Sequence, residues 1–78
     1  MKVSDYMNGL TDAWVCLLAL ADEGQVAKPT IEPFRFGFVV KCAGCEHHGQ
    51  CLSTAIDRTI RFMRGWIARM EYDRENRT

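Results

Sequence analysis

The chain has 78 residues, of which 47% are hydrophobic and 26% are charged, a composition typical of a globular protein rather than a disordered one. Ten basic residues balance ten acidic ones, so the overall charge gives no argument for nucleic-acid binding, although it does not exclude a local basic face. We expect one small domain, residues 1–78, whose marginal core needs a metal, a disulfide or a partner for stability.

The amino terminus does not resemble a secretory signal peptide, because its single basic residue, Lys2, is followed by a polar stretch. The apolar run from Trp14 to Ala21 is too short to span a bilayer. We therefore expect a cytoplasmic protein without membrane contact. In that compartment, clustered cysteines are more often metal ligands than disulfides.

The first predicted element is a helix. Between Val3 and Ala21, apolar residues recur every three or four positions, and Gly24 is expected to end the helix. Two prolines, Pro29 and Pro33, then indicate a connector, because each removes a backbone N–H donor and discourages helix.

The next predicted element is a strand over residues 34–40, where phenylalanine or valine occupies every second position. No second strand is evident to pair with it. From Leu52, a heptad-like apolar rhythm predicts a helix to about Arg64, with Gly65-Trp66 at a turn or kink. An arginine row on the opposite side is either a solvated face or a surface for phosphate or carboxylate groups: Arg58, Arg61, Arg64 and Arg69.

The stretch that carries chemistry is residues 42–51, where three cysteines are spaced C-x2-C-x5-C, with Cys16 as the fourth cysteine far upstream. Three clustered thiols and one distant thiol indicate a metal site. A zinc ion needs four thiolate or imidazole ligands in a tetrahedron. A zinc knuckle that omits Cys16 would take its ligands from within the stretch: Cys42, Cys45, Cys51 and either His47 or His48.

An iron–sulfur cluster needs four thiolates and would use every cysteine of the chain: Cys16, Cys42, Cys45 and Cys51. The long loop between the first two of these thiols is no obstacle, because loop-closure cost grows slowly with length. In either case, metal binding would supply folding free energy. The spacing alone does not choose between zinc and iron–sulfur.

Thiol–disulfide chemistry at the C-x-x-C pair is a third reading, but no βαβ pattern surrounds Cys42 and Cys45, and Cys51 would be unexplained. The adjacent His47 and His48 have no partnered nucleophile or carboxylate pair, and we interpret them as exposed polar residues on the turn. The sequence therefore does not predict an enzyme.

Taken together, the motifs resemble the WhiB-like family of actinobacteria and their phages. In that family, a lone upstream cysteine precedes a C-x2-C-x5-C group, a leucine, a short helix, a turn with glycine and tryptophan, and an acidic, arginine-rich helix. The matching residues run through most of the chain, from Trp14 to about position 77: Cys16, Cys42, Cys45, Cys51-Leu52, Ala55-Ile56, Gly65-Trp66 and 70–75.

The resemblance implies a mainly α fold, in which helices pack around a 4Fe–4S cluster held by four cysteines, with room for an extended segment near 34–40. It implies a transcription regulator that binds the carboxy-terminal domain of the primary sigma factor as a one-to-one heterodimer. Clusters of this family react with nitric oxide and oxygen. By resemblance, the cluster ligands are Cys16, Cys42, Cys45 and Cys51, and the partner-binding residues are Gly65 and Trp66.

The chain also departs from the family pattern. Gly65 and Trp66 lack the residue that normally separates them and the glycines that normally follow, and Glu46 replaces a frequent proline. The basic tail through which many members contact DNA is missing, so DNA is a weaker expectation than the sigma factor. We therefore expect this chain to be a short, divergent member of the family, of the kind that phages carry. Such a member would act by occupying a sigma factor of the host.

Overall fold

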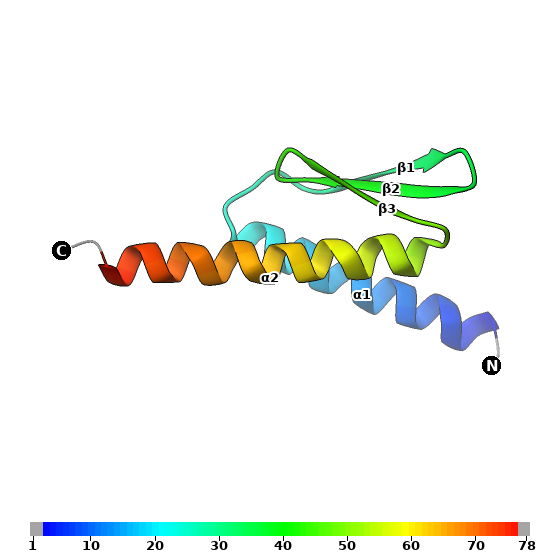
Figure 1. Cartoon of the computed structure of the whole chain (residues 1–78). Coiled ribbons are helices and arrows are strands. Elements are labelled where there is room, and N and C mark those ends of the chain that lie inside the picture. Colours follow the sequence, from blue (N-terminus) through cyan, green and yellow to red (C-terminus); the bar gives the residue numbers. More distant parts are fainter. Residues whose placement is uncertain (1–2, 77–78) are drawn as a thin grey trace.

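The computed structural model describes residues 3–76, with side chains from Gly9 onward. In chain order, a helix is followed by a meander of three strands and then by a second helix, and the strands lie on one side of both helices (Figure 1). The elements are α1 (Val3–Glu23), β1 (Thr30–Phe34), β2 (Gly37–Cys42), β3 (Cys45–Gly49) and α2 (Leu52–Asn76). No helix within residues 3–76 is long and apolar enough to cross a membrane.

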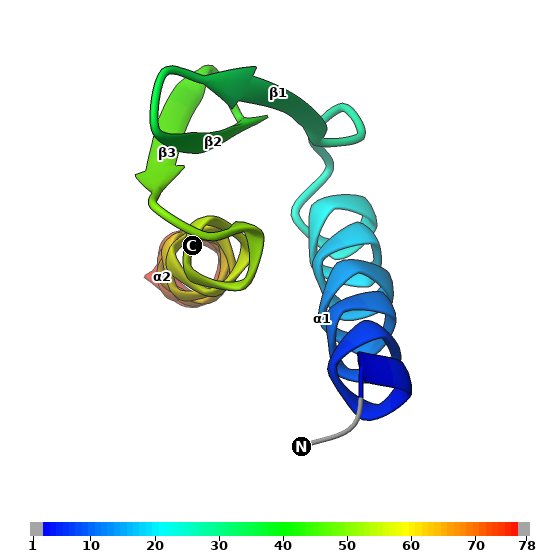
Figure 2. The ribbon, with the colours of Figure 1, turned by 90° about the vertical axis from the view of Figure 1, so that its right-hand side faces the viewer.

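The fold has two layers, a sheet and a pair of helices. The three strands are antiparallel in the order β1-β2-β3, and β2 and β3 pack on α2, which also packs along α1. Figure 2, a view along α2, shows the sheet above the two helices. The carboxy-terminal part of α2 extends past the sheet on one side, and the amino-terminal part of α1 extends on the other (Figure 1).

The core lies between the layers. α1 contributes Leu17, β2 contributes Val40, and α2 contributes Ile56 and Met63, each at most 1% exposed. Thr59 is the polar side chain of this core among the described residues, and its hydroxyl donates to the carbonyl of Ala55 at 2.7 Å, which satisfies its hydrogen-bonding need within the helix.

The expectation of a mainly α protein is met in part, because two long helices are present but a three-stranded sheet packs on them. Extended structure near 34–40 is confirmed, but the segment divides into the end of β1, a turn at Arg35-Phe36, and β2. The partner strands that the sequence did not reveal are β1 and β3, which pair on either side of β2. Helices packed around a cluster are therefore not what the described residues show; a sheet packs on the helices instead.

The predicted turn or kink at Gly65-Trp66 is wrong, because α2 runs without interruption from Leu52 to Asn76. A glycine inside a helix costs only about 1 kcal/mol relative to alanine. That cost is too small to break a helix whose apolar face is held by Ile56, Ile60 and Met63 in the core.

Candidate functional site

The predicted ligands Cys42 and Cys45 face each other at one end of the sheet. They form the last cross-strand pair of β2 and β3, joined by the two-residue turn Ala43-Gly44. Both turn residues have positive φ, 53° and 76°, as a type I′ hairpin turn requires. Cys42 is 3% exposed, whereas Cys45 is exposed.

The other two cysteines are held elsewhere. Cys51 follows the far end of β3, and five extended residues separate that end from Cys45 by about 13 Å, at roughly 3.3 Å per residue. Cys16 lies on α1, partly buried against the core. Among the described side chains, residues 9–76, no three His, Cys, Asp or Glu gather where they could hold a metal ion. This arrangement does not fit a four-thiolate cluster, which needs all four sulfurs to converge.

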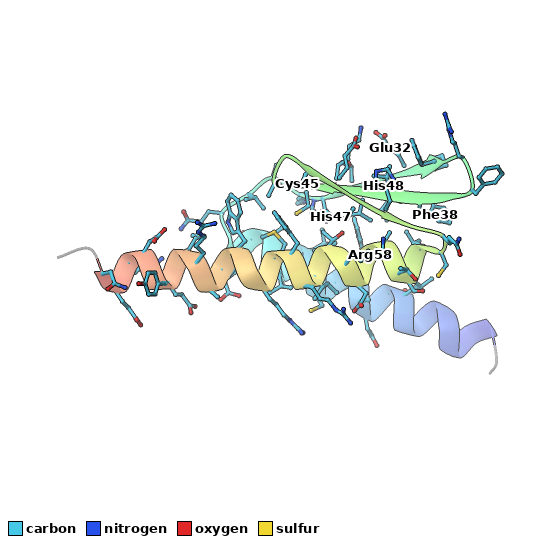
Figure 3. The ribbon with its side chains drawn as sticks, in the orientation of Figure 1. Glu32, Phe38, Cys45, His47, His48 and Arg58 are labelled. Atoms are coloured by element: carbon cyan, nitrogen blue, oxygen red, sulfur yellow. The ribbon has the colours of Figure 1, made fainter. Side chains whose placement is uncertain are left out.

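The two histidines lie in β3 rather than on an exposed turn. Alternation along the strand places His47 toward α2 and His48 on the outer face, as Figure 3 shows. The His47 ring packs 4.7 Å from the Phe62 ring, and its buried Nε2 has no hydrogen-bond partner in the described structure. Burial, and then the neighbouring His48, lowers the pKa of His47. A zinc knuckle does not fit either, because Cys51 lies a strand length from the hairpin turn.

The residues predicted to bind a partner both lie within α2. Gly65 is exposed with open space around its Cα, and Trp66 packs against the end of α1, where its indole N–H donates to the Gly24 carbonyl at 3.1 Å. Trp66 therefore has an intramolecular role, although 38% of the side chain stays exposed. Sigma-factor binding through these residues stays a prediction.

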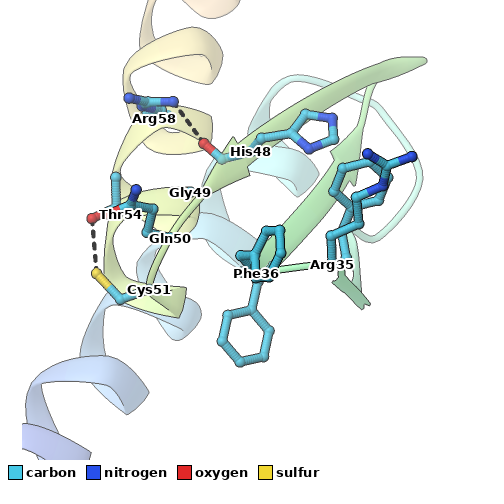
Figure 4. Close-up of a pocket in the computed structure, with 11 residues that line it drawn as sticks. Arg35, Phe36, His48, Gly49, Gln50, Cys51, Thr54 and Arg58 are labelled. Atoms are coloured by element: carbon cyan, nitrogen blue, oxygen red, sulfur yellow. Dashed lines mark hydrogen bonds between the residues drawn. The ribbon is translucent and has the colours of Figure 1, made fainter.

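A pocket of about 480 Å³ opens where the β1–β2 turn faces the amino-terminal end of α2 (Figure 4). Its volume lies in the range of small-molecule sites, about 300–1,000 Å³. The wall on the strand side is aromatic and carries one arginine; the wall on the helix side is polar. The lining residues are Phe34, Arg35, Phe36, Gly37, Phe38, His48, Gly49, Gln50, Cys51, Thr54 and Arg58.

The charged side chains that line this pocket are two arginines, and no aspartate or glutamate is among the lining residues. The carboxylate of Glu46 lies just beyond the lining, 3.6 Å from the Nε2 of His48. Arg58 donates one N–H to the carbonyl of His48 at 2.8 Å, which anchors the guanidinium at the pocket and leaves four N–H donors for a ligand. The imidazole of His48 packs edge-on against Phe34, with ring centroids 4.8 Å apart.

Arg35 holds an unusual backbone conformation. Its φ is +42°, in the left-handed region that favours glycine or asparagine and costs other residues about 1–2 kcal/mol. Strain of this kind gathers at binding and catalytic sites, where a side chain is worth more than its local conformation costs. Arg35 is also the first residue of the two-residue turn between β1 and β2, where hairpin geometry favours a positive φ, as it does at Ala43.

Cys51 occupies the capping position of α2. Its carbonyl accepts the N–H of Ala55 at 3.2 Å, and its Sγ lies 3.5 Å from the Ser53 hydroxyl and 3.0 Å from the Thr54 hydroxyl. The Ser53 hydroxyl, then the hydroxyl and backbone N–H of Thr54, lower the pKa of Cys51 from 9.0 to about 7. The dashed line in Figure 4 marks its contact with Thr54.

We expect alkylation of Cys51 by iodoacetamide to rise with a midpoint near pH 7, because the thiolate is the reacting form. Thr54→Val removes one donor and should move the midpoint upward, toward 9. Thr30→Val, on the exposed edge strand β1, is the matched control and should leave the midpoint unchanged. Because the folded pKa is depressed, the stabilisation from this thiolate is complete above about pH 9 and is lost as the pH falls through 7. A midpoint near 9 in the wild type would contradict the capping geometry.

From the sequence, the phenylalanines of this segment are expected to line a cofactor or to fill the core, and no role is assigned to Arg35 or to the pocket; the exposure of Phe34 and Phe36 contradicts a place in the core. The available signal was Phe34-Arg35-Phe36 between two extended segments, since aromatic residues that alternate with a cation are typical of nucleic-acid surfaces. Arg58 belonged to the arginine row for which phosphate contact was one open interpretation. The structure brings Arg58 to the same pocket as Arg35.

Comparison with protein-family models, with curated proteins and with solved structures finds no match to this chain.

Proposed function

We propose that this protein is a non-enzymatic binding protein that takes nucleotide units of a single-stranded nucleic acid at the pocket beside the amino terminus of α2. The observation that carries the proposal is the composition of the pocket: exposed aromatic rings and two guanidinium groups with no acidic side chain among them. Proteins that bind single strands combine these two features, a cationic groove and aromatic side chains on which bases stack.

The aromatic side of the pocket supplies the stacking surface. Phe36 is 94% exposed and Phe34 is 50% exposed, although phenylalanine is among the residues most often buried. The β1–β2 turn holds both rings at the surface, and neither belongs to the hydrophobic core. Two exposed rings on one turn favour a ligand with flat apolar faces, which the bases of a single strand provide.

The polar side of the pocket supplies contacts for phosphate. The first backbone N–H groups of a helix lack carbonyl partners and favour anions, and the start of α2 borders the pocket through Cys51 and Thr54. Arg35 lies on the strand side of the pocket and Arg58 on the helix side, so each side carries one cation that a phosphate could meet. Guanidinium groups suit phosphate oxygens because they can donate two parallel hydrogen bonds.

This proposal departs from the sequence-based expectation, which favoured a sigma factor over DNA as the partner, and shares with it only the expectation of a binding protein that is not an enzyme. The sigma factor as partner remains a prediction of the family resemblance, whereas the 4Fe–4S cluster that the resemblance implies does not fit the separated thiols. The proposed binding depends on neither of them. Of the four cysteines predicted to hold the cluster, only Cys51 lines the pocket.

Binding of fluorescein-labelled oligothymidylate, measured by fluorescence anisotropy, tests the proposal. Phe36→Ala should weaken binding about 5- to 150-fold, since stacking of a base on an aromatic side chain contributes roughly 1–3 kcal/mol. Tyr72→Ala is the matched control, because Tyr72 is also exposed, at 66%, but lies on the carboxy-terminal part of α2. We expect the control to bind like the wild type, and affinity to fall as salt concentration rises.

Two results would count against this function. If the two aromatic variants lose affinity equally, the binding does not depend on the pocket. If a free mononucleotide binds as tightly as the oligonucleotide, the ligand is a small metabolite, and the single strand is excluded as the source of the nucleotide unit.

A further inference from the structure

The Cys42–Cys45 pair lies at the opposite end of the sheet from the proposed binding site, and the proposed function does not use it. We propose that these two thiols form a reversible dithiol–disulfide pair that exchanges with low-molecular-weight disulfides such as glutathione disulfide. The proposal stands on the register of the hairpin and on the unequal exposure of the two sulfurs.

The register places the two residues within bonding range. Directly opposed residues of antiparallel strands have Cα atoms about 4.5–5.5 Å apart, and disulfides join Cα atoms at about 4.4–6.8 Å. Opposed residues also project to the same face of the sheet. The type I′ turn at Ala43-Gly44 fixes this register, so the thiols need no large backbone movement to meet.

The difference in exposure assigns a role to each thiol. Cys45 is exposed and can be reached by a disulfide in solution, whereas Cys42 is 3% exposed and can be reached only from its neighbour. Exposed disulfides are among the more easily reduced ones, so the bond should be reversible.

The reaction balances with glutathione disulfide as the oxidant. The Cys45 thiolate attacks one sulfur of glutathione disulfide, whose S–S bond breaks and releases one glutathione thiolate. Cys42 then gives its proton to solvent and attacks the Cys45 sulfur of the mixed disulfide, which expels the second glutathione. Two electrons have passed from the cysteine pair to the oxidant, and excess reduced glutathione drives both steps in reverse.

The same pair of cysteines is less well suited to binding a metal ion. Soft cations bind thiolates, but zinc and iron–sulfur centres need four ligands. Where side chains are described, from Gly9 to Asn76, no third His, Cys, Asp or Glu joins these two thiols in a group that could hold an ion. A disulfide needs two partners, and the hairpin supplies two.

The experiment equilibrates the full chain with mixtures of oxidised and reduced glutathione, followed by acid quenching, alkylation and peptide mass spectrometry. We expect a Cys42–Cys45 disulfide that disappears in excess reduced glutathione. Cys16→Ser, which changes a thiol outside the pair, should oxidise like the wild type. Cys42→Ser should trap glutathione on Cys45, because the resolving thiol is gone.

The wild-type peptide map keeps the proposal falsifiable even if the substitution at the buried Cys42 prevents folding. A stable glutathione adduct on Cys45 in the wild type would overturn it, and so would a bond from Cys45 to Cys51 or a pair that stays reduced in excess glutathione disulfide. Iron and sulfide bound to the anaerobically purified wild type through these cysteines would also overturn it. None of these results depends on whether the pocket binds nucleic acid, so the two proposals fail separately.

Discussion

Gly37→Ala should destabilise the protein by roughly 3 kcal/mol, because a Cβ at this position would collide with the backbone. Gly37 begins β2 beside the end of β3, and its added carbon would overlap the Gly49 carbonyl oxygen and lie 3.0 Å from the Gln50 Cα. Backbone atoms cannot rotate away as a flexible side chain does. Urea unfolding followed by circular dichroism would show the change as a lower midpoint with an unchanged slope.

The same substitution at Gly65 is the matched control. Gly65 lies in the interior of α2, and a Cβ there meets no atom within 4 Å. Gly65→Ala should therefore stabilise the protein by about 0.5–1 kcal/mol through helix propensity alone. A destabilised Gly65→Ala would mean that the chain turns at this residue and that α2 is not continuous. A harmless Gly37→Ala would contradict the close approach of β2 and β3.

The helices were predictable because periodicity reports packing. The apolar spacing that ends near Gly24 corresponds to α1, which ends at Glu23, and the spacing from Leu52 corresponds to the buried face of α2. The error at Gly65-Trp66 arose from giving one glycine more influence than the surrounding helix. A single glycine weakens a helix by only about 1 kcal/mol, which is not enough to replace helix by a turn.

The sheet was only partly predictable because its third strand has little strand propensity. β3 reads Cys-Glu-His-His-Gly, and it is extended because it pairs with β2 and covers α2. Once β3 is extended, Cys45 and Cys51 lie at its two ends, so a C-x2-C-x5-C motif that suggests a compact metal turn becomes two separate thiol sites. Ala43-Gly44 was the available signal, since glycine at the second turn position is typical of a type I′ hairpin.

The candidate site shows a second limit of sequence reasoning. Arg58 is 23 positions beyond Arg35, and they share a pocket only because β3 returns the chain to the start of α2 beneath the β1–β2 turn. The positive φ of Arg35 has no sequence signature, since arginine is not a residue that favours this conformation. The unfavourable backbone conformation of Arg35 is therefore visible only in the structure, and Arg35 lines the pocket where binding is proposed.

Arg35→Gly should make the protein more stable and its ligand binding weaker. Glycine adopts a φ of +42° without strain, so the folded state should gain up to about 1 kcal/mol, offset in part by the greater freedom of glycine in the unfolded chain. The loss of one cation from the pocket should weaken oligothymidylate binding and reduce the slope of log affinity against log salt by about 0.7, the value for one phosphate contact on a single strand.

Ala43→Gly is the matched control, because Ala43 has a φ of +53° in the other hairpin turn and lies outside the pocket. It should change stability modestly and leave both affinity and salt slope unchanged. If Arg35→Gly binds as the wild type does, the strain at this turn serves no ligand. If it is instead much less stable, Arg35 supports the fold, and the proposed trade between conformation and binding is wrong.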